Sequence, residues 1–194
     1  MLAEAEQRCD AFFEAGLDRR YPRYLPSNPE KVFAAIATLK ESGILRGDVF
    51  CEWGSGFGIA TCMASLLGFK AYGIAIEDGL VKLSTALAQD LPIPAEYLCT
   101  SYLPEGYEEC EGIGGKDLLP PQATTSGGAI IDTTPLYDGL DPGEVDLFFV
   151  YPWPGQEEFM MDLFDEIASE DAILLIYQAD GETTVHRQSF NDEN

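Results

Sequence analysis

Residues 50–58 read Phe-Cys-Glu-Trp-Gly-Ser-Gly-Phe-Gly, and this stretch decides the predicted fold. The apolar residues at its start end a short predicted strand, 48–53, and a helix is predicted to follow over 57–67. A glycine turn between a strand and a helix lets the backbone approach a ligand closely, and the helix N-terminus offers unpaired N–H groups. The stretch therefore predicts a ligand site at the end of this strand.

The glycine spacing distinguishes two classes of nucleotide site. A dinucleotide fingerprint has its third glycine three residues after the second, and that position here is Ile59. Instead, Gly54, Gly56 and Gly58 follow a GxGxG spacing, with Glu52 two residues before the first glycine. This spacing disfavours a nicotinamide-dependent enzyme, which stays open as one alternative.

Strands and helices alternate on both sides of this turn. The predicted strands are 48–53, 70–76, 95–100, 145–151 and 171–178, and the predicted helices are 3–15, 29–42, 57–67, 79–89 and 156–168. Ser27 is expected to cap the second helix, and 182–189 is expected to add an edge strand. Strands separated by helices indicate a mostly parallel sheet covered on both faces. We expect a three-layer α/β/α fold with five or six strands.

The charge of the chain excludes one class of partner. The sequence has 34 Asp and Glu against 11 Lys and Arg, and its net charge is −23. The net charge is −1 over residues 1–50, −2 over 51–90 and −20 over 91–194. Because a nucleic-acid-binding protein needs clustered Lys and Arg, we expect no nucleic-acid partner. The acidic half is typical of a solubilising surface, and it would also attract a cationic substrate or a basic protein.

Cysteine, histidine and hydropathy limit the remaining classes. The five cysteines form no CxxC pair and His186 is the only histidine, so no metal site is expected. Cys51, Cys62 and Cys99 lie in apolar runs and are predicted to be small core residues. No apolar run approaches the ~20 residues that span a bilayer, and the first residues lack the basic end of a secretory peptide. We expect a soluble, cytoplasmic protein with no membrane partner.

Three stretches of the sequence resemble one family. Residues 52–58, EWGSGFG, look like motif I of the class I S-adenosylmethionine-dependent methyltransferases, which have a Rossmann-like fold. Residues 71–77, AYGIAIE, look like the second strand of that family, and residues 146–154, DLFFVYPWP, are similar to its motif IV. The resemblance covers about residues 28–178. It implies S-adenosyl-L-methionine as the cofactor and methyl transfer as the reaction.

The resemblance also implies which residues bind the methionine part of the cofactor. By the match to motif I, these are Glu52, Gly54, Ser55 and Gly56. The Glu52 carboxylate can pair with the ammonium group of the cofactor, and the glycine backbone passes beneath it.

The ribose and adenine parts are matched less closely. The family usually places an acid for the ribose hydroxyls at the position of Ala75, and Glu77, two residues later, is the candidate here. Ser101, at the end of the third strand, is the candidate for the adenine, although turn chemistry explains this serine equally well.

The acceptor side is predicted at Tyr151-Pro152-Trp153-Pro154. Tyr151 stands where amino-methylating members of the family often carry an acid or an amide, and no general base is identifiable. Tyr151 and Trp153 are the candidate catalytic residues, and Trp153 can stack on a planar or cationic acceptor or only pack the turn. The acceptor is expected to be a small molecule or a basic protein segment.

The domain organisation follows from these matches. We expect one methyltransferase-like domain over 1–194, whose parts are an N-terminal helix and lid-like segment (1–27), a cofactor-binding half (28–103), a long loop insertion (104–144) and a C-terminal half (145–194). The C-terminal hairpin of the family is predicted to be truncated, and the open sheet edge suggests a homodimer. Together with Ala75 and the atypical motif IV, the truncation favours an alternative, a catalytically inactive binding or scaffold protein.

Overall fold

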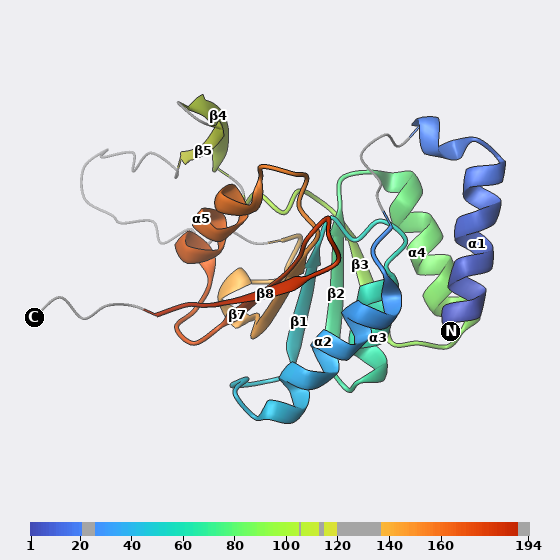
Figure 1. Cartoon of the computed structure of the whole chain (residues 1–194), viewed down its shortest axis with the longest axis horizontal. Coiled ribbons are helices and arrows are strands. Elements are labelled where there is room, and N and C mark those ends of the chain that lie inside the picture. The colour runs from blue at the N-terminus through green and yellow to red at the C-terminus, as the bar shows by residue number, and fades with distance from the viewer. Residues whose placement is uncertain (21–25, 105, 113–114, 120–136, 190–194) are drawn as a thin grey trace, which may run out of the picture.

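The computed structural model describes residues 1–20, 26–104, 106–112, 115–119 and 137–189 of the chain. Its main feature is a six-stranded sheet with the order β3-β2-β1-β6-β7-β8 (Figure 1). The strands are β1 Val49–Trp53, β2 Lys70–Ala75, β3 Ala95–Cys99, β6 Leu147–Val150, β7 Ile173–Tyr177 and β8 Thr183–Arg187. The first five of these strands are parallel, and β8 pairs with β7 in the antiparallel direction. The predicted mostly parallel sheet of five or six strands is confirmed.

Helices cover both faces of this sheet. They are α1 Leu2–Glu14, α2 Pro29–Ser42, α3 Ile59–Leu66, α4 Asp78–Asp90 and α5 Glu157–Ile167, with short 3₁₀ helices η1 Leu17–Arg20 and η2 Pro142–Glu144. Alternate strand residues point to opposite faces, so Phe50 packs with α2 and α3 whereas Cys51 packs with α5. The α4 helix lies on the α3 side, with α1 outside it (Figure 1). The predicted three layers are therefore present.

The α2 helix begins at Pro29 as predicted, but its capping residue differs from the prediction by one position. Asn28, not Ser27, is the N-cap, and its Oδ1 accepts a hydrogen bond of 3.0 Å from the backbone N–H of Lys31. Pro29 is already helical, because its fixed φ suits the first helical position and leaves the preceding residue to cap.

The segment predicted as a long loop, 104–144, contains two paired strands. β4 (Glu108–Gly112) pairs with β5 (Gly115–Leu119) in the antiparallel direction, apart from the main sheet and beside α5 (Figure 1). Pairing satisfies the backbone polar groups of a stretch whose glycines and acids indicated a loop. Residues 120–136 of the insertion lie outside the described part of the chain.

After β7, the described residues add one antiparallel strand to the main sheet. A tight turn follows β7, in which the Gln178 N–H donates to the Glu182 carbonyl at 2.9 Å, and β8 runs back beside β7. This strand confirms the edge strand predicted at 182–189. Pairing of two copies across the β8 edge stays a prediction.

Two expectations about composition can be compared with the structure. Cys51 and Cys62 are buried as expected, but Cys99 is exposed, because it ends β3, the edge strand of the sheet. Among the described residues, no group of three His, Cys, Asp or Glu side chains could hold a metal ion. Within the same residues, every helix is too short or too polar to cross a membrane.

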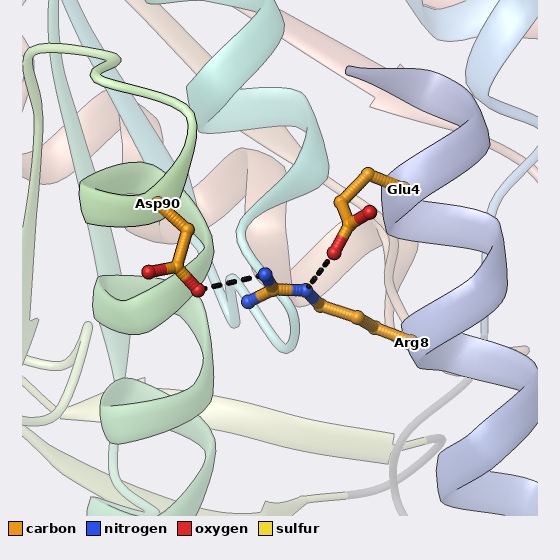
Figure 2. A network of polar contacts seen from close by, with 3 residues as sticks. All are labelled: Glu4, Arg8 and Asp90. Atoms are coloured by element: carbon orange, nitrogen blue, oxygen red, sulfur yellow. Dashed lines mark hydrogen bonds and ion pairs between the residues drawn. The ribbon is translucent and has the colours of Figure 1, made fainter.

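The α1 helix is attached to the domain by a small apolar contact and an ion pair. Phe12, only 4% exposed, packs edge-on against Phe57 of the glycine turn, with 4.9 Å between ring centroids. Figure 2 shows Arg8 between two acids: its Nε donates to Glu4 at 2.8 Å, and its Nη2 donates to Asp90 of α4 at 2.7 Å. The partly exposed ion pair contributes little because water and salt screen it.

We therefore expect Phe12→Ala to destabilise the protein far more than Asp90→Asn does. Removal of a buried phenylalanine ring costs about 3 kcal/mol or more, whereas loss of a surface ion pair costs about 1 kcal/mol or less. The free energy of unfolding of both variants, measured by urea denaturation, checks this. Equal losses would contradict the larger contribution of the ring contact.

Candidate functional site

The sequence-predicted site residues meet at one edge of the sheet. The carboxyl ends of the parallel strands lie together there, and the strand order reverses between β1 and β6 at the middle of this edge. Ligands of open α/β sheets bind at such a reversal. The candidates at this edge are Glu52, Gly54, Ser55 and Gly56 from β1 and its turn, Glu77 after β2, Ser101 after β3, and Tyr151 and Trp153 after β6.

The turn after β1 has a left-handed backbone at all three of its glycines. The φ angles of Gly54, Gly56 and Gly58 are 73°, 51° and 69°. Other residues pay about 1–2 kcal/mol in this region, which explains the GxGxG spacing. The Ser55 N–H donates to the carbonyl of Ile74 at 2.8 Å, so the turn is also bonded to β2.

Two features of the turn suit a bound ligand. A Cβ built on Gly54 would meet no atom within 4 Å, so the backbone there faces open space. Ser55 is buried, and its Oγ has no hydrogen-bond partner among the described residues. A buried hydroxyl without a partner is costly unless a ligand or water completes it. Open space beside an unsatisfied hydroxyl fits a polar ligand that lies on the turn.

Glu52 is buried between β1 and α3. It is 7% exposed, and its Oε2 accepts hydrogen bonds from the backbone N–H of Thr61 at 2.9 Å and from the Thr61 hydroxyl at 2.5 Å. Burial raises the pKa of Glu52 to about 7, although both Thr61 bonds act in the opposite direction. One carboxylate oxygen therefore holds the start of α3. Its pairing with a cofactor ammonium stays a prediction.

The predicted ribose position lies at the end of β2. The strand ends at Ala75, which is buried, and the next side chain, Ile76, is 63% exposed. Glu77 is exposed and is the N-cap of α4, but its side chain makes no capping hydrogen bond. Its carboxylate is thus not used by the helix, and its role toward a ribose stays a prediction.

Ser101 forms a turn at the end of β3. Its Oγ accepts a hydrogen bond of 3.0 Å from the Leu103 N–H, and the residue is exposed. Ser101 thus has the turn-forming role that the sequence also allowed. Its contact with an adenine stays a prediction.

The predicted acceptor residues differ in how firmly they are held. Tyr151 is half-buried, and its ring packs edge-on against Tyr177 with 4.9 Å between centroids. The Tyr177 hydroxyl accepts a hydrogen bond of 3.2 Å from the Asn28 N–H, so this pair is also attached to the start of α2. Trp153 is 38% exposed on the following turn. Of the lid-like segment before α2, residues 21–25 lie outside the described part of the chain.

Sequence reasoning missed two residues that hold the glycine turn. Thr61 bonds Glu52, and the Tyr97 hydroxyl of β3 donates to the carbonyl of Gly58 at 2.8 Å. One signal was present: Gly73 is a glycine inside a strand, which indicates a close approach by another group. A Cβ at this position would lie 2.8 Å from the Tyr97 ring.

Comparison with solved structures shows the same fold. One similar structure is an RNA methyltransferase from Salinibacter ruber, solved with S-adenosyl-L-homocysteine. It is 16% identical in sequence, with a TM-score of 0.55, and the match covers 88% of this chain and 96% of that chain. The magnesium protoporphyrin IX methyltransferase of Synechocystis, also with S-adenosyl-L-homocysteine, is 16% identical with a TM-score of 0.48 and covers 89% and 70%. No family model and no curated protein matches. The first likeness confirms the predicted Rossmann-like methyltransferase fold.

We expect Glu52 to make the protein less stable as the pH rises. The pKa of about 7 in the folded chain exceeds the ordinary value of 4.5, so the folded state binds this proton more tightly than the unfolded state does. The free energy of unfolding that this group contributes therefore falls between about pH 4.5 and about pH 7. Relative to Glu52→Gln, the wild-type chain should lose about 2 kcal/mol between about pH 5 and about pH 8.

Urea denaturation of both proteins at these two pH values measures this difference. The amide oxygen of the glutamine can still accept from Thr61, so the comparison isolates the ionisation of Glu52. A difference in unfolding free energy that is the same at both pH values would contradict the raised pKa.

Proposed function

We propose that the chain binds S-adenosyl-L-methionine on the glycine turn after β1 and transfers its methyl group to an acceptor. One observation carries this proposal: the open space over Gly54 beside the unpartnered Ser55 hydroxyl, at the strand-order reversal of a methyltransferase fold. The Salinibacter ruber protein with the same fold was solved with the demethylated form of this cofactor. That likeness supports the proposal, and the local geometry of the turn fits it.

The residues of the turn are suited to the methionine part of this cofactor. The left-handed glycines bring the backbone close to the ligand, and the Ser55 hydroxyl can donate to a carboxylate or accept from an ammonium. A positive ligand group near Glu52 would favour the ionised carboxylate and lower its pKa. Glu77 and Ser101 are the candidates for the ribose and the adenine at the neighbouring strand ends.

Methyl transfer requires the protein mainly to align the acceptor with the cofactor. The bound cofactor supplies an electrophilic methyl group on a sulfonium, which an acceptor lone pair can take while the S–C bond breaks. A protonated amine has no free lone pair, so it first gives one proton to water, and the protein then holds the neutral nitrogen in line with the S–C bond that breaks. The pair of Tyr151 and Tyr177 forms a fixed wall at the end of β6, and the exposed ring of Trp153 can stack on the acceptor.

Charge at this edge favours a cationic acceptor, either a small molecule or a basic protein segment. Exposed acids follow the strands: Glu77 after β2, Glu158 at the start of α5, and Asp180 and Glu182 after β7. Lys31 also lies near this edge, where its Nζ donates to the Gly181 carbonyl at 2.9 Å. An acidic rim attracts cations and repels the phosphates of nucleic acids.

An inactive methyltransferase-like binding protein is the second candidate. The buried Ala75 at the usual position of the ribose acid favours it, because the strand end offers no carboxylate there. Loss of such a hydrogen bond costs about 1–3 kcal/mol, which would weaken the binding of the cofactor without preventing it. Binding of the cofactor without turnover of any acceptor would support this candidate.

We expect Gly54→Ala to abolish the binding of S-adenosyl-L-homocysteine while the fold persists. The new methyl group would enter the open space over the turn and would add strain of about 1–2 kcal/mol at a φ of 73°. Gly43→Ala is a matched control, since Gly43 ends α2 with a φ of 71° and also faces open space. Calorimetric titration of the wild type and both variants measures the affinity.

The control should lose similar stability and keep its affinity for the ligand. If the wild-type chain shows no heat and no thermal shift at millimolar S-adenosyl-L-homocysteine, the proposed cofactor is wrong. If Gly54→Ala binds as tightly as the wild type, the ligand does not lie on the glycine turn.

We expect methyl transfer to cationic acceptors and not to anionic ones. Release of S-adenosyl-L-homocysteine can be followed with a Lys- and Arg-rich peptide, a Glu-rich peptide of equal length, a small primary amine and a small carboxylate. Turnover of the cationic probes should fall as salt rises, because salt screens the acidic rim. Equal turnover of cationic and anionic probes would contradict a role for the charge.

A further inference from the structure

We propose that Tyr97 is a positioning residue that holds the glycine turn in the conformation that binds the cofactor. This inference rests on the proposed function, and it concerns a residue of β3 that lies outside motif I. The side chain reaches across β2 from the neighbouring strand and ends at the N-cap of α3.

The hydrogen bond of Tyr97 ends on a carbonyl that two elements share. Its hydroxyl donates to the Gly58 carbonyl at 2.8 Å, and the Cys62 N–H donates to the same oxygen at 2.9 Å as the first bond of α3. A carbonyl oxygen can accept two such bonds. The phenol therefore fixes the peptide at which the turn ends and the helix begins.

Two glycines leave the space that this side chain fills. A Cβ on Gly58 would lie 2.2 Å from the Tyr97 ring, and a Cβ on Gly73 of β2 would lie 2.8 Å from it. The Gly73 Cβ would also lie 2.8 Å from the Cβ of Ser55, so turn, strand and ring all meet at this point. Because these groups fit together this closely, the Tyr97 ring restrains the turn at Gly58 and Ser55.

The Cys62 thiol forms a second hydrogen bond with the Tyr97 hydroxyl. The Cys62 Sγ lies 3.1 Å from the Tyr97 hydroxyl. Because the phenol gives its one proton to Gly58, the thiol must donate to the phenol oxygen. Burial raises the pKa of Tyr97 and of Cys62, so both groups keep the protons that this chain of bonds needs.

Tyr97→Phe tests the hydroxyl without removing the ring. We expect affinity for S-adenosyl-L-homocysteine to fall about 3- to 10-fold, which matches the loss of one hydrogen bond. Turnover at saturating cofactor should change less than the KM for the cofactor, because the variant still reaches the bound conformation. Tyr72→Phe is the matched control, a buried tyrosine of β2 on the α5 face of the sheet.

Amide hydrogen exchange of the unliganded chain supplies a readout that needs no cofactor. In Tyr97→Phe, exchange should speed up in the turn and the start of α3, residues 54–62, and stay unchanged in β6 and β7. A merely structural role would instead raise exchange throughout the domain in step with the loss of stability. Tyr72→Phe should leave the turn at its wild-type rate.

The outcomes separate the two proposals. If the wild type takes up no S-adenosyl-L-homocysteine, the proposed function fails, and the exchange experiment still decides whether Tyr97 holds the turn. Unchanged exchange over residues 54–62 in Tyr97→Phe overturns the inference. An equal loss of affinity in Tyr72→Phe also overturns the inference, because the loss would then result from lower overall stability.

Discussion

The left-handed backbone at Gly54, Gly56 and Gly58 is the constraint on which the rest of the site depends. It turns the chain from β1 into α3 within five residues and leaves open space over Gly54. Any side chain at these φ angles is strained, so the turn needs glycine at each of the three positions. The strand-order reversal at β1 then places this open backbone in the middle of the carboxyl edge.

Buried polar contacts hold the glycine turn and the start of α3 in place. Glu52 accepts two hydrogen bonds from Thr61, and Tyr97 donates to the carbonyl of Gly58. The two contacts come from different strands and meet at the first turn of α3, so the start of that helix is fixed on two sides. A preorganised turn loses less conformational freedom when a ligand binds, which favours affinity.

The acceptor side is built differently from the cofactor side. At the end of β6, Tyr151 is held by the buried ring of Tyr177. Exposed acids at this edge are Glu77, Glu158, Asp180 and Glu182, and further acids lie before β6 and β7, at the opposite edge. The charge is uneven along the sequence: residues 1–90 have a net charge of −3 and residues 91–194 a net charge of −20.

Local sequence patterns were sufficient for the elements and for the turn. Apolar periodicity placed every strand of the main sheet to within about two residues, and GxGxG after a strand located the glycine turn, because periodicity and glycine φ are local properties. Local patterns were insufficient where a feature depends on contacts between residues far apart in the sequence. The paired strands at 108–112 and 115–119 were read as part of a loop, and Cys99 was placed in the core, because pairing and burial depend on contacts that local patterns do not show.

The sequence by itself thus determined where the helices and the strands of the main sheet lie along the chain. It also determined the glycine turn at residues 54–58, since each of these features depends on neighbours along the chain. Only the tertiary structure decided that Tyr97 crosses β2 to reach Gly58, that Thr61 occupies one oxygen of Glu52, and that Phe12 packs on the turn. The physical reason is that these contacts join side chains from different elements. Their partners are set by strand order and register, which a single sequence does not display.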